Sequence, residues 1–349
     1  MKKIILFIAC LALVGHAQTK RATELPDISV IGNMVATSTD SNKSMDVSEI
    51  ELTFQHYLYP NIKADVFLGL HKETNGQRKI DLEEGYVTFA DSLNTLIPNA
   101  GLPSGLEAIV GKKFIGIGKV NALHPEQWQF TDRPLAIKQF FGQDHGLSGE
   151  GIQLAYLLPI PLFSQVELGY WTPSAHEEVA GASHGIEYEN RLISTRLWNS
   201  LAVSNDQELQ FGFNYLQGNP SASSKDDKQT LMGTDITFHQ NMGPGRLTLQ
   251  GEIYRVEYGD EGESAEKQNG SYVSGTVDIT SEYQAGIRYD QLGKHGDEGS
   301  ELSQVAVMLT RQLTETSKFR LQYNSGENVE NTIYAQFIFG MGPHSHVLN

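Results

Sequence analysis

The sequence has little cysteine, little positive charge and no long apolar run beyond its N-terminus. Its one cysteine, Cys10, lies so early that a chain cleaved after Ala17 would have no thiol for a disulfide, metal site or nucleophile. Lys and Arg total 26 against 42 Asp and Glu, and the formal net charge of −16 argues against a nucleic-acid partner. No later stretch approaches the roughly 18 apolar residues of a membrane-spanning helix. If the mature chain crosses a membrane, it therefore does so with strands.

The N-terminus has the pattern of an export signal. Lys2 and Lys3 precede an apolar run at residues 4–14, and small residues follow up to Ala17. This pattern predicts a secretory signal peptide at residues 1–17, followed by a periplasmic lead-in at residues 18–28. A lipoprotein signal ending at Cys10 is the weaker alternative, because few apolar residues precede that cysteine.

Alternation of apolar and polar residues dominates the rest of the chain. In residues 318–324, for example, Phe319, Leu321 and Tyr323 share one face of a strand and polar residues the other. About sixteen such segments follow one another, with mostly alternating short and long connectors, as in membrane barrels. We predict an all-β fold: a single transmembrane antiparallel β-barrel over residues 29–340. The connector at residues 91–105 is too long for a turn, so about fourteen to eighteen strands stay open.

The alternation stops over residues 115–148, the third long loop. Aromatic, charged and proline residues are packed together there, and a long loop of this composition is typical of a functional segment. We predict that this loop folds into the barrel lumen; the alternative is an extracellular cap held by its own aromatic side chains. The candidates for a pore constriction are His124, Glu126, Asp132, Arg133 and Lys138.

The same segment carries a resemblance. It contains Asn121, the pair His124-Pro125, Trp128, the run Phe130-x-Asp132-x-Pro134-Leu135, and Phe140-x-Gly142. This pattern is similar to that of a porin-like family of Gram-negative outer-membrane β-barrels, some members of which are named zinc-regulated outer-membrane receptors. The resemblance implies an outer-membrane barrel, with a metal ion as one candidate cargo.

The histidines supply the candidate metal ligands. His344 and His346 lie in a C-terminal tail, residues 341–349, with the i, i+2 spacing that can chelate Zn²⁺ or another divalent cation. The alternative is an exposed tail with no ligand, since two ligands alone make a weak site. His56 and His71 fall on consecutive predicted strands and would meet only in one register. We expect no other cofactor.

The predicted function is a porin-like channel for small hydrophilic solutes or ions in the outer membrane of a Gram-negative bacterium. Its partners would be outer-membrane lipid, small solutes or cations, and two further copies of the chain in a homotrimer. One alternative is a metal-binding receptor without an open channel, and a second is an exported soluble all-β binding protein. We predict no enzyme, because no nucleophile, metalloprotease or nucleotide-binding motif appears.

Overall fold

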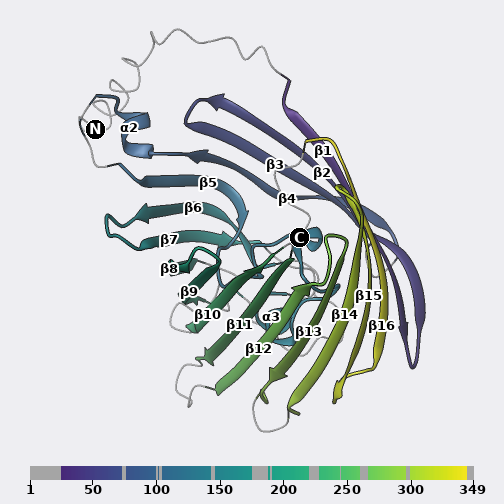
Figure 1. Cartoon of the computed structure of the whole chain (residues 1–349). Coiled ribbons are helices and arrows are strands. Elements are labelled where there is room, and N and C mark those ends of the chain that lie inside the picture. Colours follow the sequence, from purple (N-terminus) through teal and green to yellow (C-terminus); the bar gives the residue numbers. More distant parts are fainter. Residues whose placement is uncertain are drawn as a thin grey trace.

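Figure 1 shows the computed structural model, in which the strands form one closed antiparallel barrel. The structure describes residues 25–72, 76–99, 101, 104–142, 146–174, 188, 191–219, 228–243, 245–259, 266–295 and 299–343. Within these residues sixteen strands follow in sequence order, and the ring closes because β1 pairs with both β2 and β16. The predicted all-β barrel is therefore confirmed. Within the part of the chain that the structure describes, no helix is long and apolar enough to cross a bilayer.

The strands range from nine to seventeen residues. They are β1 (Asp27–Thr39), β2 (Lys43–Tyr59), β3 (Ile62–Lys72), β4 (Arg78–Phe89), β5 (Leu106–Phe114), β6 (Ser148–Leu157), β7 (Phe163–Pro173), β8 (Leu192–Ser204), β9 (Gln207–Gly218), β10 (Gln229–Met242), β11 (Gly245–Tyr258), β12 (Glu266–Asp278), β13 (Tyr283–Leu292), β14 (Leu302–Thr314), β15 (Ser317–Glu327) and β16 (Thr332–Met341).

The uncertain connector at residues 91–105 contains a short helix, α2 (Ser92–Leu96), and no further strand among its described residues. The strand count is therefore sixteen. In the β1–β16 pair, Val30 lies opposite Met341, so β1 begins and β16 ends at the edge of the barrel that carries the short turns. His56 lies opposite Ala64 and His71 opposite Glu49, so the two histidines do not meet across the sheet.

The two faces of the wall differ as the alternation predicted. On β15, Phe319, Leu321 and Tyr323 point outward and are 38–47% exposed, whereas Lys318 and Arg320 point inward and are 1% exposed. Successive side chains leave a strand on opposite faces, so this contrast repeats around the ring. The barrel therefore has an apolar exterior and a largely polar interior.

An apolar core nevertheless lies inside the barrel, near the ends of the strands that carry the long loops. Inward-facing wall residues such as Trp171, Leu231 and Val256 are fully buried there. They pack against residues of the third loop, including Ile117, Ile137, Phe140 and Phe141. The loop helix α3 (Leu135–Phe141) contacts β12 and β13 (Figure 1).

Candidate functional site

The third loop connects β5 to β6, and its described residues, 115–142 and 146–147, lie inside the barrel. It contains η1 (Pro125–Gln127) and α3. Near its start, the Gly118 amide donates to Asn214 Oδ1 of β9 at 3.1 Å. Gly118 has φ +64°, and a Cβ there would overlap the carboxylate of Glu252 and the hydroxyl of Tyr254. The loop therefore approaches the β9–β11 wall as closely as glycine allows.

His124 anchors the loop to a second sector of the wall, β2–β4. Its Nδ1 lies 2.7 Å from Glu51 Oε2 and its Nε2 lies 3.0 Å from Glu84 Oε2, while the ring stacks on Phe67. Burial alone would lower the pKa of His124, but hydrogen bonds to Glu51, Glu83 and Glu84 outweigh it and raise the pKa well above the usual range. The side chain is therefore an imidazolium held between carboxylates at neutral pH.

Asp132 anchors the loop to a third sector, β13–β15. Its Oδ1 accepts from Arg288 Nη2 at 3.0 Å and from Gln322 Nε2 at 2.6 Å. Its Oδ2 accepts from Lys138 Nζ at 2.7 Å and from Asn324 Nδ2 at 3.1 Å. Burial on its own would raise the pKa of Asp132, but Arg288 and Lys138 hold it well below its usual range. The carboxylate is therefore a charged tie between loop and wall.

Glu126 and Arg133 complete the loop's internal and wall contacts. The backbone carbonyl of Glu126 accepts a hydrogen bond from Lys318 Nζ at 2.7 Å. Arg133 donates to the carbonyl of Gly142 at 3.0 Å and to Asn121 Oδ1 at 3.2 Å, both within the loop. These two bonds of Arg133 therefore help to fix the shape of the loop.

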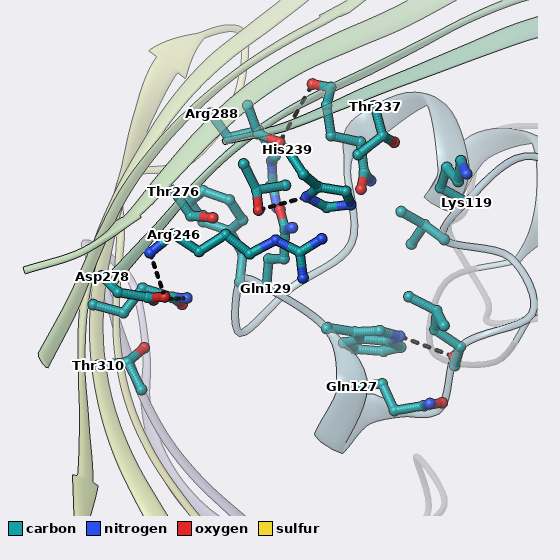
Figure 2. Close-up of a pocket in the computed structure, with 18 of the residues that line it drawn as sticks. Lys119, Gln127, Gln129, Thr237, His239, Arg246, Thr276, Asp278, Arg288 and Thr310 are labelled. Atoms are coloured by element: carbon teal, nitrogen blue, oxygen red, sulfur yellow. Dashed lines mark hydrogen bonds between the residues drawn. The ribbon is translucent and has the colours of Figure 1, made fainter. Parts of the chain in front are cut away.

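A polar cavity of about 680 Å³ remains between the loop and the β9–β14 wall. Figure 2 shows Arg246 and His239 reaching from the wall toward the loop residues Gln127 and Gln129. Burial lowers the pKa of Lys119, which borders the cavity from the loop. The charged lining balances three cations against three anions: Lys119, Arg246, Arg288, Asp132, Asp278 and Glu282. The uncharged lining is mainly hydroxyl and amide groups, including Thr248, Gln250, Ser274, Thr276 and Gln284.

The five predicted constriction residues are brought into one loop inside the lumen but have different surroundings. Asp132 borders the cavity, whereas His124, Glu126 and Arg133 are 1–2% exposed and are buried in contacts. Lys138 pairs with Asp132. A constriction role for this set stays a prediction. The predicted metal ligands His344 and His346, like the signal peptide, lie outside the described residues.

The wall side of the cavity was not singled out from the sequence. Arg246, His239 and Thr248 stand on strands whose alternation was visible, so the signal for an inward orientation existed. The sequence gives no signal for which inward positions the third loop leaves uncovered, because that depends on contacts between distant segments.

A closed sixteen-stranded antiparallel barrel with a loop inside its lumen is the fold of outer-membrane porins, and solved structures agree. OmpT of Vibrio cholerae (in-vitro folded, trimer form) matches with a TM-score of 0.57 at 9% identity, covering 91% of this chain and 100% of that one. The anion-selective porin from Comamonas acidovorans gives 0.58 at 10% identity, covering 90% and 100%. Pseudomonas putida OprB gives 0.58 at 9% identity, covering 91% and 94%. The chain therefore has the porin barrel fold.

Sequence comparison adds one relative. An uncharacterized protein of Aquifex aeolicus (strain VF5) is 28% identical over an alignment of 288 residues, and the match covers 70% of this chain. The match covers 60% of that relative's length. No family model matches the sequence. The porin-like part of the predicted resemblance is thus confirmed at the level of fold, and the zinc-regulated receptor name receives no support.

Proposed function

We propose that the protein is an outer-membrane channel through which small hydrophilic solutes or ions diffuse. The observation that carries this proposal is the polar cavity between the third loop and the β9–β14 wall. Hydroxyl, amide and charged groups line it, and such groups replace part of the hydration shell of a passing solute. The cavity would be the part of the lumen through which solutes move, with the loop as its inner boundary.

The apolar exterior supports placement in a bilayer. Outward residues such as Leu168, Phe213, Ile253 and Ile287 are 52–59% exposed. A soluble exported protein would present such side chains to water, whereas a membrane barrel presents them to hydrocarbon. The alternative of a soluble binding protein is therefore disfavoured. The fold also supports the predicted homotrimer as a proposal, since one similar structure is described as a trimer.

Asp132 is the proposed constriction residue with the most direct support, because it both ties the loop to the wall and borders the cavity. His124, Glu126, Arg133 and Lys138 would act by holding the loop in place. In this view the residues of the loop set the width of the passage, and the wall opposite supplies most of its polar lining.

Single-channel conductance in a planar bilayer tests the proposal with two neighbouring variants on β11. Thr248 faces the cavity and is 8% exposed, whereas Leu249 faces outward and is 45% exposed. Because Thr248→Trp adds volume inside the passage, we expect lower unit conductance. Leu249→Trp adds the same ring outside and should leave the conductance unchanged. Heat-modifiable migration in gels checks that both variants fold. A natural protein without conductance steps would favour the closed metal-binding receptor instead, and equal effects of the two substitutions would contradict the assigned passage.

A further inference from the structure

Three neighbouring strands bring carboxylates and an imidazole together inside the barrel, away from the cavity. Glu49 of β2 lies directly opposite His71 of β3 in the antiparallel register. Side chains of directly opposed residues share a face, with Cβ atoms about 4.5–5.5 Å apart. Glu49 and Glu51 are 5% and 1% exposed, so this face is the interior. The strand pairing therefore places one carboxylate beside one imidazole.

A β-bulge in β4 adds a third ligand. Phe67 pairs with Glu84 and Leu68 pairs with Leu82, so Glu83 is an extra residue on β4. Regular alternation would send one of two consecutive side chains outward. The bulge instead leaves both Glu83 and Glu84 buried, at 7% and 3% exposed. Glu83 is thereby turned toward Glu49 and His71.

The potential ligand atoms converge over a glycine. His71 Nε2 lies 2.8 Å from Glu83 Oε1. One ligand atom from each of Glu49, His71 and Glu83 lies within 4.8 Å of the other two. A Cβ on Gly69 would overlap both His71 Nε2 and Glu83 Oε1. The three groups therefore meet in space that a side chain at position 69 would fill.

In the part of the chain that the structure describes, a buried oxygen of this cluster lacks a partner that a cation could supply. Glu49 is almost fully buried, and its Oε1 has no hydrogen-bond partner within the described residues. Leaving a buried polar atom unpaired costs about 1–3 kcal/mol, and more when the group is charged. Glu49, Glu51 and Glu83 lie together with His71 and His124. A divalent cation between Glu49, His71 and Glu83 would give this Glu49 oxygen the partner that it lacks among the described residues.

We propose that Glu49, His71 and Glu83 form a binding site for a divalent transition-metal cation such as Zn²⁺. One imidazole with two carboxylates suits zinc and its first-row neighbours, whereas calcium and magnesium prefer oxygen ligands alone. Zinc bonds of about 2.0–2.2 Å place tetrahedral ligands about 3.3–3.5 Å apart. The 2.8 Å contact between His71 and Glu83 needs to open by less than about 1 Å to admit the ion.

The surroundings provide an orienting group and an entry path. His124 Nδ1 lies 3.6 Å from Glu83 Oε2, on the oxygen opposite the one that faces His71. An outer group of this kind fixes the direction of a metal-binding carboxylate. The His71 side chain is 14% exposed and stands one residue before the long-loop end of β3. A cation therefore reaches the site from the loop side of the barrel.

Calorimetry with Zn²⁺ on the detergent-solubilised full chain tests this site. The parent protein should carry His344→Ala and His346→Ala, so that zinc binding by the tail does not contribute. We expect one Zn²⁺ per chain in this parent. Loss of an outer-shell partner alone weakens metal binding by about 10–100-fold, so H71A and E49Q should each weaken it at least tenfold. Glu252→Gln is the control, because Glu252 is an equally buried glutamate whose carboxylate accepts from Tyr254 and Tyr272 hydroxyls.

Two further readouts separate ligation from misfolding. The visible spectrum of bound Co²⁺ should show the intense bands of a four- or five-coordinate site in the parent and lose them in H71A. E49Q removes one ligand carboxylate, so Zn²⁺ should raise the unfolding temperature of the parent and should no longer raise that of E49Q. Absence of zinc binding in the parent, or binding unchanged in both E49Q and H71A, would overturn the proposal. None of these measurements depends on conductance, so failure of the channel proposal leaves them decisive.

Discussion

Replacing Asp132 by alanine removes the charged tie between the third loop and the β13–β15 wall but leaves the hydrogen bond from Arg288 Nη1 to the backbone carbonyl of residue 132. The substitution deletes the acceptor for Arg288, Lys138, Gln322 and Asn324 at once. Breaking a buried ion pair by removing one partner costs about 3–5 kcal/mol, because the other charge is left buried. Arg288 keeps Asp290, at 2.9 Å, as a second partner. We therefore expect the free energy of unfolding to fall by about 3 kcal/mol, at the lower end of that range.

Two measurements check this expectation. Guanidinium unfolding in detergent micelles gives the stability, and single-channel recording gives the current noise, which should rise because the loop borders the cavity. Asp46→Ala is the matched control: Asp46 pairs with Lys72, but their side chains are 32% and 40% exposed. Exposed pairs are worth about 0–1 kcal/mol. If Asp132→Ala and Asp46→Ala lower the stability equally and give the same current noise, Asp132 does not anchor the loop.

Acid provides a second arm of the same test. Arg288 and Lys138 outweigh burial and depress the pKa of Asp132 in the folded protein. The resulting stabilisation is fully present above the ordinary pKa of about 3.9 and is lost as pH falls below it. Between pH 5 and pH 3 the natural chain should therefore lose stability, while its current noise should stay unchanged because Asp132 keeps its charge in the folded barrel. Asp132→Ala should lack this part of the acid effect, and an identical acid response in both proteins would contradict the assignment.

Two other substitutions probe the loop and the cavity. Gly118→Ala should lower the free energy of unfolding by more than about 2 kcal/mol, since φ is +64° and the methyl would overlap Tyr254. Gly116→Ala is the control, because its Cβ would have one neighbour at 3.1 Å. Equal losses of stability in the two variants would refute the close approach of Gly118 to the wall. Arg246→Glu changes the lining charge by two units, each worth about 0.7 kcal/mol for an ion about 6 Å away in water. The cation-to-anion permeability ratio, measured from reversal potentials in a salt gradient, should therefore rise severalfold. An unchanged ratio would place Arg246 outside the ion path.

The wall of the barrel could be predicted from local pattern. Phe319 and Leu321 point outward and Arg320 inward because strand geometry fixes the alternation, whatever the strand pairs with. The short helix after β4 explains why the connector at residues 91–105 was too long for a turn and left a strand count of fourteen to eighteen open around the predicted sixteen. Loop position was also predictable, since the run of aromatic and charged residues interrupts the alternation where the chain enters the lumen.

The interior could not be predicted to the same depth. Trp171 and Val256 face inward, where alternation predicts polar groups, because the third loop supplies them with an apolar partner. Glu83 gives no sign in the sequence that a bulge turns it toward the lumen, since the extra residue shows only in the register with β3. His124 was singled out from its loop, but its partners Glu51 and Glu84 come from two other strands. Such contacts are set by tertiary packing.

Polar contacts tie the third loop to the ring at three places, through Gly118 at β9, His124 at β2 and β4, and Asp132 at β13 and β15. Three points of attachment around a circumference act as an internal brace. A barrel without such a brace deforms easily into an oval cross-section, whereas a loop attached at several places of the wall resists this deformation. The bore should accordingly keep its shape when the lateral pressure of the surrounding lipid changes.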